Sequence, residues 1–111
     1  MDEGKELHEF DDLDKFSRSV AKFVARSSGY TFKELKRYIR LGNVKKIIKN
    51  HAQFIEDHYV ITEEDAHEAC EEILDWLVGV ELASLASDGV LDCWWDNDRN
   101  QMVFQSVAKK P

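Results

Sequence analysis

The sequence predicts a mainly α-helical domain of four to five helices that closes with a C-terminal β-hairpin. Apolar residues recur at helical spacing from about residue 13 to residue 86, and the only proline is Pro111, so no proline interrupts a helix. Two strand-like segments flank a turn composition near the C-terminus. With 111 residues, 43% of them hydrophobic, the chain fits a single domain with its own core.

The N-terminal residues 1–11 predict a flexible acidic tail, because they carry many charges and few apolar side chains. The domain then occupies residues 12–108. No apolar run reaches the roughly 18–20 residues of a membrane span, and the N-terminus lacks the pattern of a signal peptide. We therefore expect no membrane contact and a cytoplasmic location, where Cys70 and Cys93 stay reduced.

The first helix is expected from about Leu13 to Ser27, with a cap at Asp11 or Asp12 and an end at Ser28-Gly29. Its apolar face is matched by a basic face on the opposite side. The apolar face consists of Leu13, Phe16, Val20, Phe23 and Val24, and the basic face of Lys15, Arg18, Lys22 and Arg26.

The second helix has a well-defined start, since Thr31 and Glu34 fit a capping box. The helix should bury Leu35, Tyr38 and Ile39 and end at Gly42. Its other side carries a basic stripe of Lys33, Lys36, Arg37 and Arg40.

Asn43 can cap the third helix, which is expected from about Val44 to Asp57. The spacing places its polar residues on one exposed face. That face consists of Lys45, Lys46, Lys49, Asn50 and Gln53.

A fourth helix should begin at Thr62, and Gly79 is a point where it can break or bend before the pattern ends at Asp88-Gly89. Its outer face is acidic, with Glu64, Glu68, Glu71, Glu72 and Asp75. Strands at Val90–Trp95 and Gln101–Val107 then predict the hairpin, at about residues 90–107. Trp94 and Trp95 should point to opposite faces, so one is expected to be buried and the other exposed as an interface anchor. The alternative is that the hairpin is covered on both faces.

Charge is distributed in blocks, although the net charge is −7. Residues 15–49 contain eleven Lys or Arg and one acid, whereas residues 50–98 contain fourteen acids and no Lys or Arg. Two interpretations stay open. The blocks can attract each other within the domain, or the basic block can form a binding face that an acidic remainder keeps soluble.

Two segments carry a resemblance to known folds. Residues 30–55, YTFKELKRYIRLGNVKKIIKNHAQFI, resemble a helix-turn-helix, with a three-residue turn containing Gly42. Residues 82–91, LASLASDGVL, resemble the helix that leads into the hairpin of a winged-helix domain. The resemblance implies a winged-helix-like, nucleic-acid-binding fold. Winged-helix domains also bind proteins, and the acidic residues that precede this hairpin favour that role.

The sequence shows little sign of catalytic or metal chemistry. His67 and Cys70 lie three residues apart, a spacing that metal sites use, but no second pair matches them. Neither cysteine has the neighbours of a reactive thiolate, and the five glycines are dispersed instead of forming a phosphate-binding loop. We expect no metal, no cofactor and no enzymatic activity.

The favoured hypothesis is a nucleic-acid-binding regulator of the helix-turn-helix type, with a role in transcription regulation. Lysine and arginine side chains of the second and third helices would contact phosphates, and Asn50 and Gln53 would reach base edges. The alternative is a protein-interaction module or small inhibitor that docks through its acidic helix and through Trp94 and Trp95. A homodimer is compatible with either hypothesis.

Overall fold

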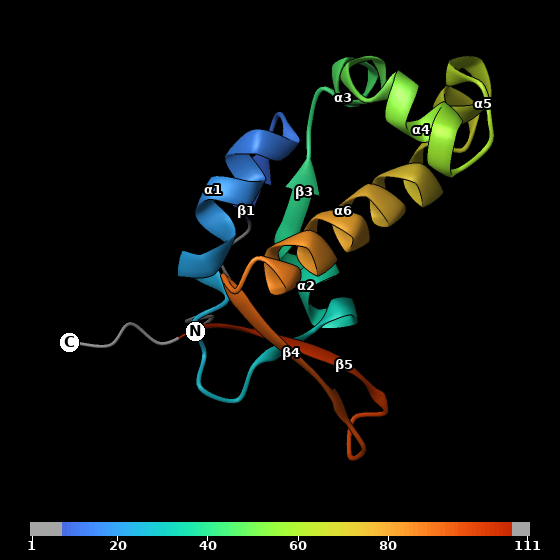
Figure 1. The fold of residues 1–111 in the computed structure, drawn as a ribbon. Helices are drawn as coiled ribbons and strands as arrows, with labels where there is room; N and C mark the ends of the chain where they lie inside the picture. The colour runs from blue at the N-terminus through green and yellow to red at the C-terminus, as the bar shows by residue number, and fades with distance from the viewer. Residues whose placement is uncertain (1–7, 108–111) are drawn as a thin grey trace.

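The computed structural model describes residues 8–107, which form six helices and five strands (Figure 1). The elements are β1 (His8–Phe10), α1 (Leu13–Phe23), β2 (Tyr30–Thr31), α2 (Phe32–Tyr38), β3 (Ile39–Leu41), α3 (Val44–Asn50), α4 (Ala52–His58), α5 (Glu63–Glu68), α6 (Cys70–Ser87), β4 (Leu91–Asp96) and β5 (Gln101–Ser106). The prediction of a mainly helical chain with a C-terminal hairpin is confirmed, with more helices than expected.

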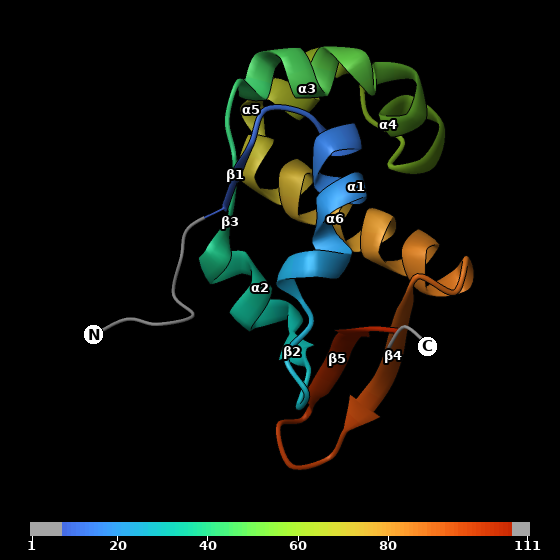
Figure 2. The ribbon, with the colours of Figure 1, turned by 90° about the vertical axis from the view of Figure 1, so that its left-hand side faces the viewer.

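Two small sheets connect distant parts of the chain. β2, β5 and β4 form a three-stranded antiparallel sheet in the order β2-β5-β4. Val103 of the central strand β5 lies opposite Thr31 of β2 on one side and opposite Trp94 of β4 on the other. β1 and β3 form a parallel pair in which Glu9 lies opposite Arg40. Figure 2 shows these two sheets at different levels of the molecule, with the hairpin projecting at one end.

The long helix α6 connects the two ends of the molecule. It extends from the end formed by α3, α4 and α5 to the hairpin at the other end (Figures 1 and 2). Its residues Ile73, Leu77 and Leu82 are buried in the same apolar core as Phe16 of α1 and Leu35 of α2. Within residues 8–107, no helix is long and apolar enough to cross a membrane.

The expected acidic tail includes a strand. Residues 8–10 form β1, and the Phe10 carbonyl accepts a 2.9 Å hydrogen bond from the Gly42 amide. The Phe10 ring is buried and lies edge-on to the Phe16 ring, 5.4 Å between centroids. This burial explains why the tail prediction was wrong for residues 8–10, whereas residues 1–7 lie outside the described residues, as does residue 108 at the other predicted boundary.

The second helix begins as predicted and ends early. Thr31 Oγ1 accepts from the Glu34 amide and Glu34 Oε1 accepts from the Thr31 amide, both at 3.0 Å, which confirms the capping box. The chain then leaves the helix after Tyr38, because Ile39–Leu41 pair with β1 as strand β3. The three-residue turn expected around Gly42 is therefore absent from this part of the described chain, and a strand separates α2 from α3.

The first and third helices are also shorter than expected. α1 ends at Phe23, since the Val24 carbonyl accepts from the Ser106 amide of β5 at 3.1 Å instead of continuing the helix. The third helix is interrupted at His51, whose φ of −115° and ψ of 17° are not helical, and resumes as α4. The bend allows Ile47, Ile48 and Ile55 to be fully buried together.

The fourth helix divides at Ala69 and not at Gly79. Thr62 caps α5 by accepting from the Asp65 amide at 3.1 Å, as predicted. Ala69 has φ −102° and ψ 36°, so α5 and α6 are separate helices. α6 then passes Gly79 without interruption, and no atom apart from the neighbouring helix backbone lies within 4 Å of the position that a Cβ would take there.

The hairpin is confirmed, and the prediction for its two tryptophans is wrong. Both side chains are exposed, Trp94 at 37% and Trp95 at 53%. The helices cover only the inner part of the hairpin, where Leu91 and Phe104 are buried. Farther out, the Trp94 ring lies against the chain at Gly29 and is still partly exposed, and Trp95 on the other face is more exposed. Strand alternation is present, but it does not place either ring in the core.

Candidate nucleic-acid interface

The fold divides the residues of the predicted basic face into three groups. The first group lies in a groove of about 300 Å³ between α2, β3 and α6. Lys36 Nζ is 2.7 Å from Asp75 Oδ2 across this groove, and Arg40 lines it together with Glu71. Apolar side chains complete the lining, namely Ile39, Leu41, Leu74 and Val78. Lys36, of the basic block, is thus paired with Asp75, of the acidic block, as expected if the two blocks attract each other within the domain.

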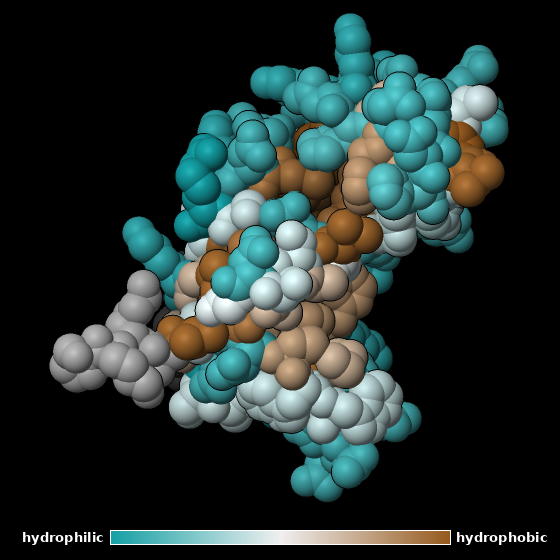
Figure 3. All heavy atoms as spheres, viewed as in Figure 1, coloured by the Kyte–Doolittle hydropathy of each residue, from teal (hydrophilic) through white to brown (hydrophobic). Residues whose placement is uncertain are grey.

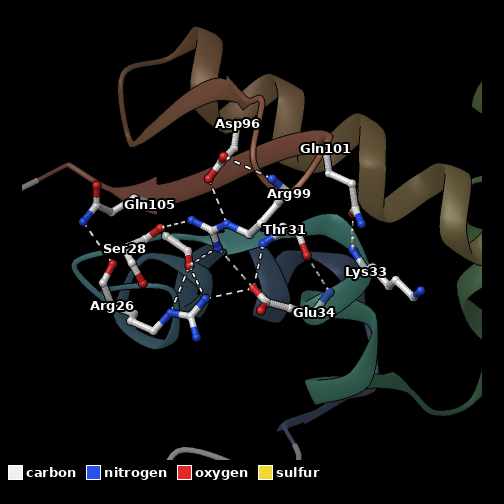
Figure 4. A network of polar contacts seen from close by, with 10 residues as sticks. Arg26, Ser28, Thr31, Lys33, Glu34, Asp96, Arg99, Gln101 and Gln105 are labelled. Atoms are coloured by element: carbon white, nitrogen blue, oxygen red, sulfur yellow. Dashed lines mark hydrogen bonds and ion pairs between the residues drawn. The ribbon is translucent and has the colours of Figure 1, made fainter.

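The second group faces the start of β5. Lys33 and Arg37 are exposed and line a shallow recess with Phe32 and Gln101. The Lys33 amide donates to Gln101 Oε1 at 3.4 Å, which fastens the start of α2 to the hairpin (Figure 4). The side chains of this group thus lie next to the sheet, and Lys36, which lines both hollows, adjoins them.

The third group lies on α3, where Lys45, Lys46 and Lys49 are exposed while Ile47 and Ile48 are fully buried. Among residues 8–107, none of these three lysines forms an ion pair. The expected Asn43 side-chain cap is not formed, because Asn43 adopts a left-handed φ of 47°. Figure 3 shows mostly hydrophilic side chains at the end of the molecule where α3, α4 and α5 lie, with hydrophobic atoms at its outer edge.

The two predicted base-reading residues do not share a helical face. Asn50 is the last residue of α3 and is exposed, whereas Gln53 follows the break at His51 and belongs to α4. Gln53 Nε2 donates to Asp57 Oδ1 at 3.0 Å, so its amide already has a partner within its own helix. Asn50 alone stays next to the lysines of α3.

The basic face of α1 is also divided. Lys15 Nζ lies 3.0 Å from Asp11 Oδ1, and this hydrogen bond lowers the pKa of the Asp11 carboxyl. Arg26 Nη2 lies 2.8 Å from Glu34 Oε1. Arg18 and Lys22 instead line a recess beside the inner end of the hairpin. Helical spacing indicated this face. The Lys15–Asp11 pair is local, with the partners four positions apart, whereas Arg26 lies beyond the end of α1 and its pairing with Glu34 depends on the tertiary structure.

Arg99 is part of a polar network that ties the hairpin turn to the segment between α1 and β2 (Figure 4). Its Nε donates to Asp96 Oδ2 at 2.8 Å and its Nη2 donates to the Ser28 carbonyl at 2.7 Å. The side-chain hydrogen bond from Arg99 is the main cause that lowers the pKa of Asp96, followed by the bond from the Arg99 amide. The guanidinium of Arg99 therefore has a structural role, because it connects the hairpin turn to the segment before β2.

The exposed aromatic and apolar side chains of the hairpin lie on both of its faces. Trp95 is opposite Met102, which is 38% exposed, and these two share a face with Cys93. Trp94 lies on the other face, near Gly29 and Val103. Partial burial raises the pKa of the Cys93 thiol.

The spacing of His67 and Cys70 is not retained on one helix, since Ala69 separates α5 from α6. His67 Nε2 lies 3.4 Å from Glu63 Oε2. Among the residues that the structure describes, no three His, Cys, Asp or Glu side chains gather as a possible metal site.

Comparison with known proteins supplies no family for the chain. No protein-family model, no curated protein and no solved structure matches it. A function therefore has to be inferred from the side chains themselves. Lys45, Lys46 and Lys49 of α3 form a group of exposed cations without an ion pair among residues 8–107.

Proposed function

We propose that the chain is a nucleic-acid-binding regulatory protein that contacts the phosphate backbone through Lys45, Lys46 and Lys49. One observation carries the proposal. These three lysines are exposed on two turns of α3, and no carboxylate of residues 8–107 pairs with them. Unpaired ammonium groups at this spacing can each neutralise a phosphate and release its counterion.

We further propose a winged-helix-like arrangement for the part of the chain that surrounds the sheet. The support is topological, since β2 directly precedes α2 and pairs with β5, and α6 leads into the β4-β5 hairpin. In this arrangement α6 is the helix next to the wing, and its exposed Glu71 and Glu72 would repel phosphates. Because these two residues belong to the first turn of α6, at the end of the molecule where α3 also lies, nucleic acid would approach the exposed lysine face of α3 and not the start of α6.

The test is a salt titration of binding to generic duplex and single-stranded DNA, followed by fluorescence anisotropy. Three phosphate contacts predict that log K falls with log salt at a slope of about −2.7 for duplex DNA and about −2.1 for a single strand. Replacing Lys45, Lys46 and Lys49 with Glu should abolish binding and leave the melting temperature nearly unchanged. The matched control, Arg18→Glu with Lys22→Glu on α1, should keep the slope.

The alternative function, a protein-interaction module, is supported by the exposure of Trp94 and Trp95 on the hairpin. Large aromatic side chains of this kind are frequent anchors of protein interfaces. If the wild-type chain shows no salt-dependent binding to DNA or RNA at low ionic strength, the nucleic-acid proposal is rejected and this alternative takes its place.

A further inference from the structure

The groove between α2, β3 and α6 combines an apolar lining with charges of both signs. Its volume of about 300 Å³ is at the lower end of the range for ligand sites in proteins, so it suits a small molecule. α6 contributes positions 71, 74, 75 and 78, a spacing that places them on one face of the helix. The apolar lining consists of Ile39, Leu41, Leu74 and Val78.

The charged side chains of the groove lie at two levels. Arg40 follows Lys36 by four residues, and Glu71 precedes Asp75 by four residues. α6 runs from the α5 end toward the hairpin, whereas the chain from α2 through β3 runs the opposite way, toward α3 (Figures 1 and 2). Arg40 and Glu71 therefore lie toward the α3 end of the groove, and Lys36 and Asp75 lie toward the hairpin end.

One of these two levels is closed by an ion pair and the other is open. At the level nearer the hairpin, Lys36 Nζ and Asp75 Oδ2 are 2.7 Å apart, and their ion pair spans the groove. At the level nearer α3, Arg40 and Glu71 form no ion pair with each other or with any other group of residues 8–107. Within the described part of the chain, the open level thus offers a guanidinium and a carboxylate without partners of opposite charge.

The neighbouring strand does not neutralise Arg40 either. Glu9 of β1 is the residue opposite Arg40 in the parallel pair. Its carboxylate turns toward Gly42, with Oε2 3.4 Å from the position that a Cβ would take there, and lines a separate recess with Lys15. The guanidinium of Arg40 is therefore left to the groove.

We propose that this groove binds a free apolar α-amino acid such as leucine. The Arg40 guanidinium would hold the carboxylate of the ligand through two parallel hydrogen bonds, and the Glu71 carboxylate would hold its ammonium group. The apolar lining would cover the side chain of the ligand. The site is separate from the exposed lysines of α3, so the proposal stands whether or not those lysines bind nucleic acid.

Charge balance selects this class of ligand. The groove carries two cations and two carboxylates, so its own charges sum to zero, and a zwitterion adds no net charge. A carboxylic acid without an amine would leave Glu71 unpaired, and an amine without a carboxylate would leave Arg40 unpaired. A charge that loses part of its water on binding without gaining a partner opposes binding.

Isothermal titration calorimetry with L-leucine as the probe tests the proposal. Leucine should bind saturably at millimolar concentration or below. Leucinamide, which lacks the carboxylate, and isocaproate, which lacks the ammonium group, should each bind about tenfold more weakly, because one hydrogen bond between charged groups is lost. Glycine, which lacks the apolar side chain, should show no binding. Absence of saturable binding for leucine, isoleucine, valine and methionine alike would overturn the proposal.

Two neutral variants assign the charged groups of the ligand to their partners in the groove. Arg40→Gln should no longer prefer leucine to leucinamide, and Glu71→Gln should no longer prefer leucine to isocaproate. The matched controls Arg37→Gln and Glu72→Gln remove exposed charges outside the groove lining and should keep the wild-type preferences. Melting curves establish that each variant is folded. A preference for leucine over leucinamide that survives Arg40→Gln would overturn the proposed site.

Discussion

Gly29 occupies a position where any side chain would be costly. Its φ is +79°, and a Cβ there would overlap Cγ1 of Val103, which is fully buried, and approach the Trp94 ring to 3.0 Å. The left-handed backbone and the close approach of β5 both require glycine. The sequence around Gly29 does not indicate the close approach of β5, since Val103 is distant in the chain.

Gly29→Ala should therefore lower the free energy of unfolding by about 2–3 kcal/mol, because strain and overpacking act together. Gly89→Ala is the matched control. Gly89 also has a positive φ, of +83°, but no atom beyond its two chain neighbours lies within 4 Å of its Cβ position, so only the backbone strain, about 1 kcal/mol, is expected. Urea denaturation of the two variants measures the difference, and equal losses would contradict the close contact with Val103.

The Asp96–Arg99 pair makes part of the stability depend on pH. The pKa of Asp96 is lowered in the folded chain, first by the side-chain hydrogen bond from Arg99. A lowered carboxyl pKa contributes stability that is present at neutral pH. That stability is lost as the pH falls through the usual aspartate range to the lowered value.

Asp96→Asn should accordingly melt below wild type at neutral pH, and the two melting curves should converge in acid. Asp98→Asn, at the same turn but without a side-chain contact to Arg99, is the control and should stay close to wild type at every pH. Thermal denaturation by circular dichroism across the acidic range gives the comparison. A difference between Asp96→Asn and wild type that persists in strong acid would show that the carboxyl does not act through its charge.

At the scale of elements, the starts of the side-chain-capped helices could be predicted, whereas several helix ends and the starts of α4 and α6 could not. A cap depends on residues three positions apart, so the starts at Thr31 and Thr62 are visible in the sequence. The end of α2 depends on β1, which lies some thirty residues earlier, and Ile39 continues the helical apolar pattern of Leu35. Pairing with a distant strand overrides local periodicity there.

The candidate site shows the same limit of prediction from local sequence patterns. The exposed positions of Lys45, Lys46 and Lys49 could be predicted, because the buried Ile47 and Ile48 fix the face of α3. The neutralisation of Lys36 by Asp75 could not, since the two residues meet only when α2 packs beside α6. A sequence pattern therefore predicts which side chains leave the core, but not which of them find an opposite charge.

The two helix caps make a quantitative test at this scale. Thr31→Ala should cost about 1–2 kcal/mol, since Thr31 is 3% exposed and its capping box is complete. Thr62→Ala should cost less, about 0.5–1 kcal/mol, because Thr62 is exposed and caps α5 through one hydrogen bond. Chemical denaturation orders the two losses, and the reverse order would mean that the Thr31 cap contributes little to folding.

At the scale of the whole molecule, the acidic α6 limits how much of the basic block can act. The Lys36–Asp75 pair is about 45% exposed on both sides, so it contributes little to stability, on the order of 0–1 kcal/mol. Under the proposed function, the pair has a larger effect on binding than on stability, because it keeps the Lys36 ammonium from contacting a phosphate. Asp75 of α6 would in that case limit the strength of nucleic-acid binding.

Asp75→Asn should consequently tighten binding to duplex DNA and steepen the salt slope by about 0.9, as one more phosphate contact becomes available. Glu68→Gln removes a carboxylate of α5 that has no ion pair within residues 8–107 and is the control for the change in net charge. It should tighten binding slightly and leave the slope unchanged. Equal slopes for wild type and Asp75→Asn would place Lys36 outside the interface.

The pairing of β2 with β5 has a consequence for biosynthesis. Tyr30 and Phe104 are partners in the sheet although more than seventy residues separate them. A ribosome delivers the chain from the N-terminus, so β2 leaves it long before its neighbour exists. Until then the Ser28 carbonyl lacks the Arg99 donor and the Arg26 and Ser27 carbonyls lack the Gln105 donor. The helices can assemble as they emerge, whereas the sheet, and the burial of Thr31 with it, must wait for the end of translation.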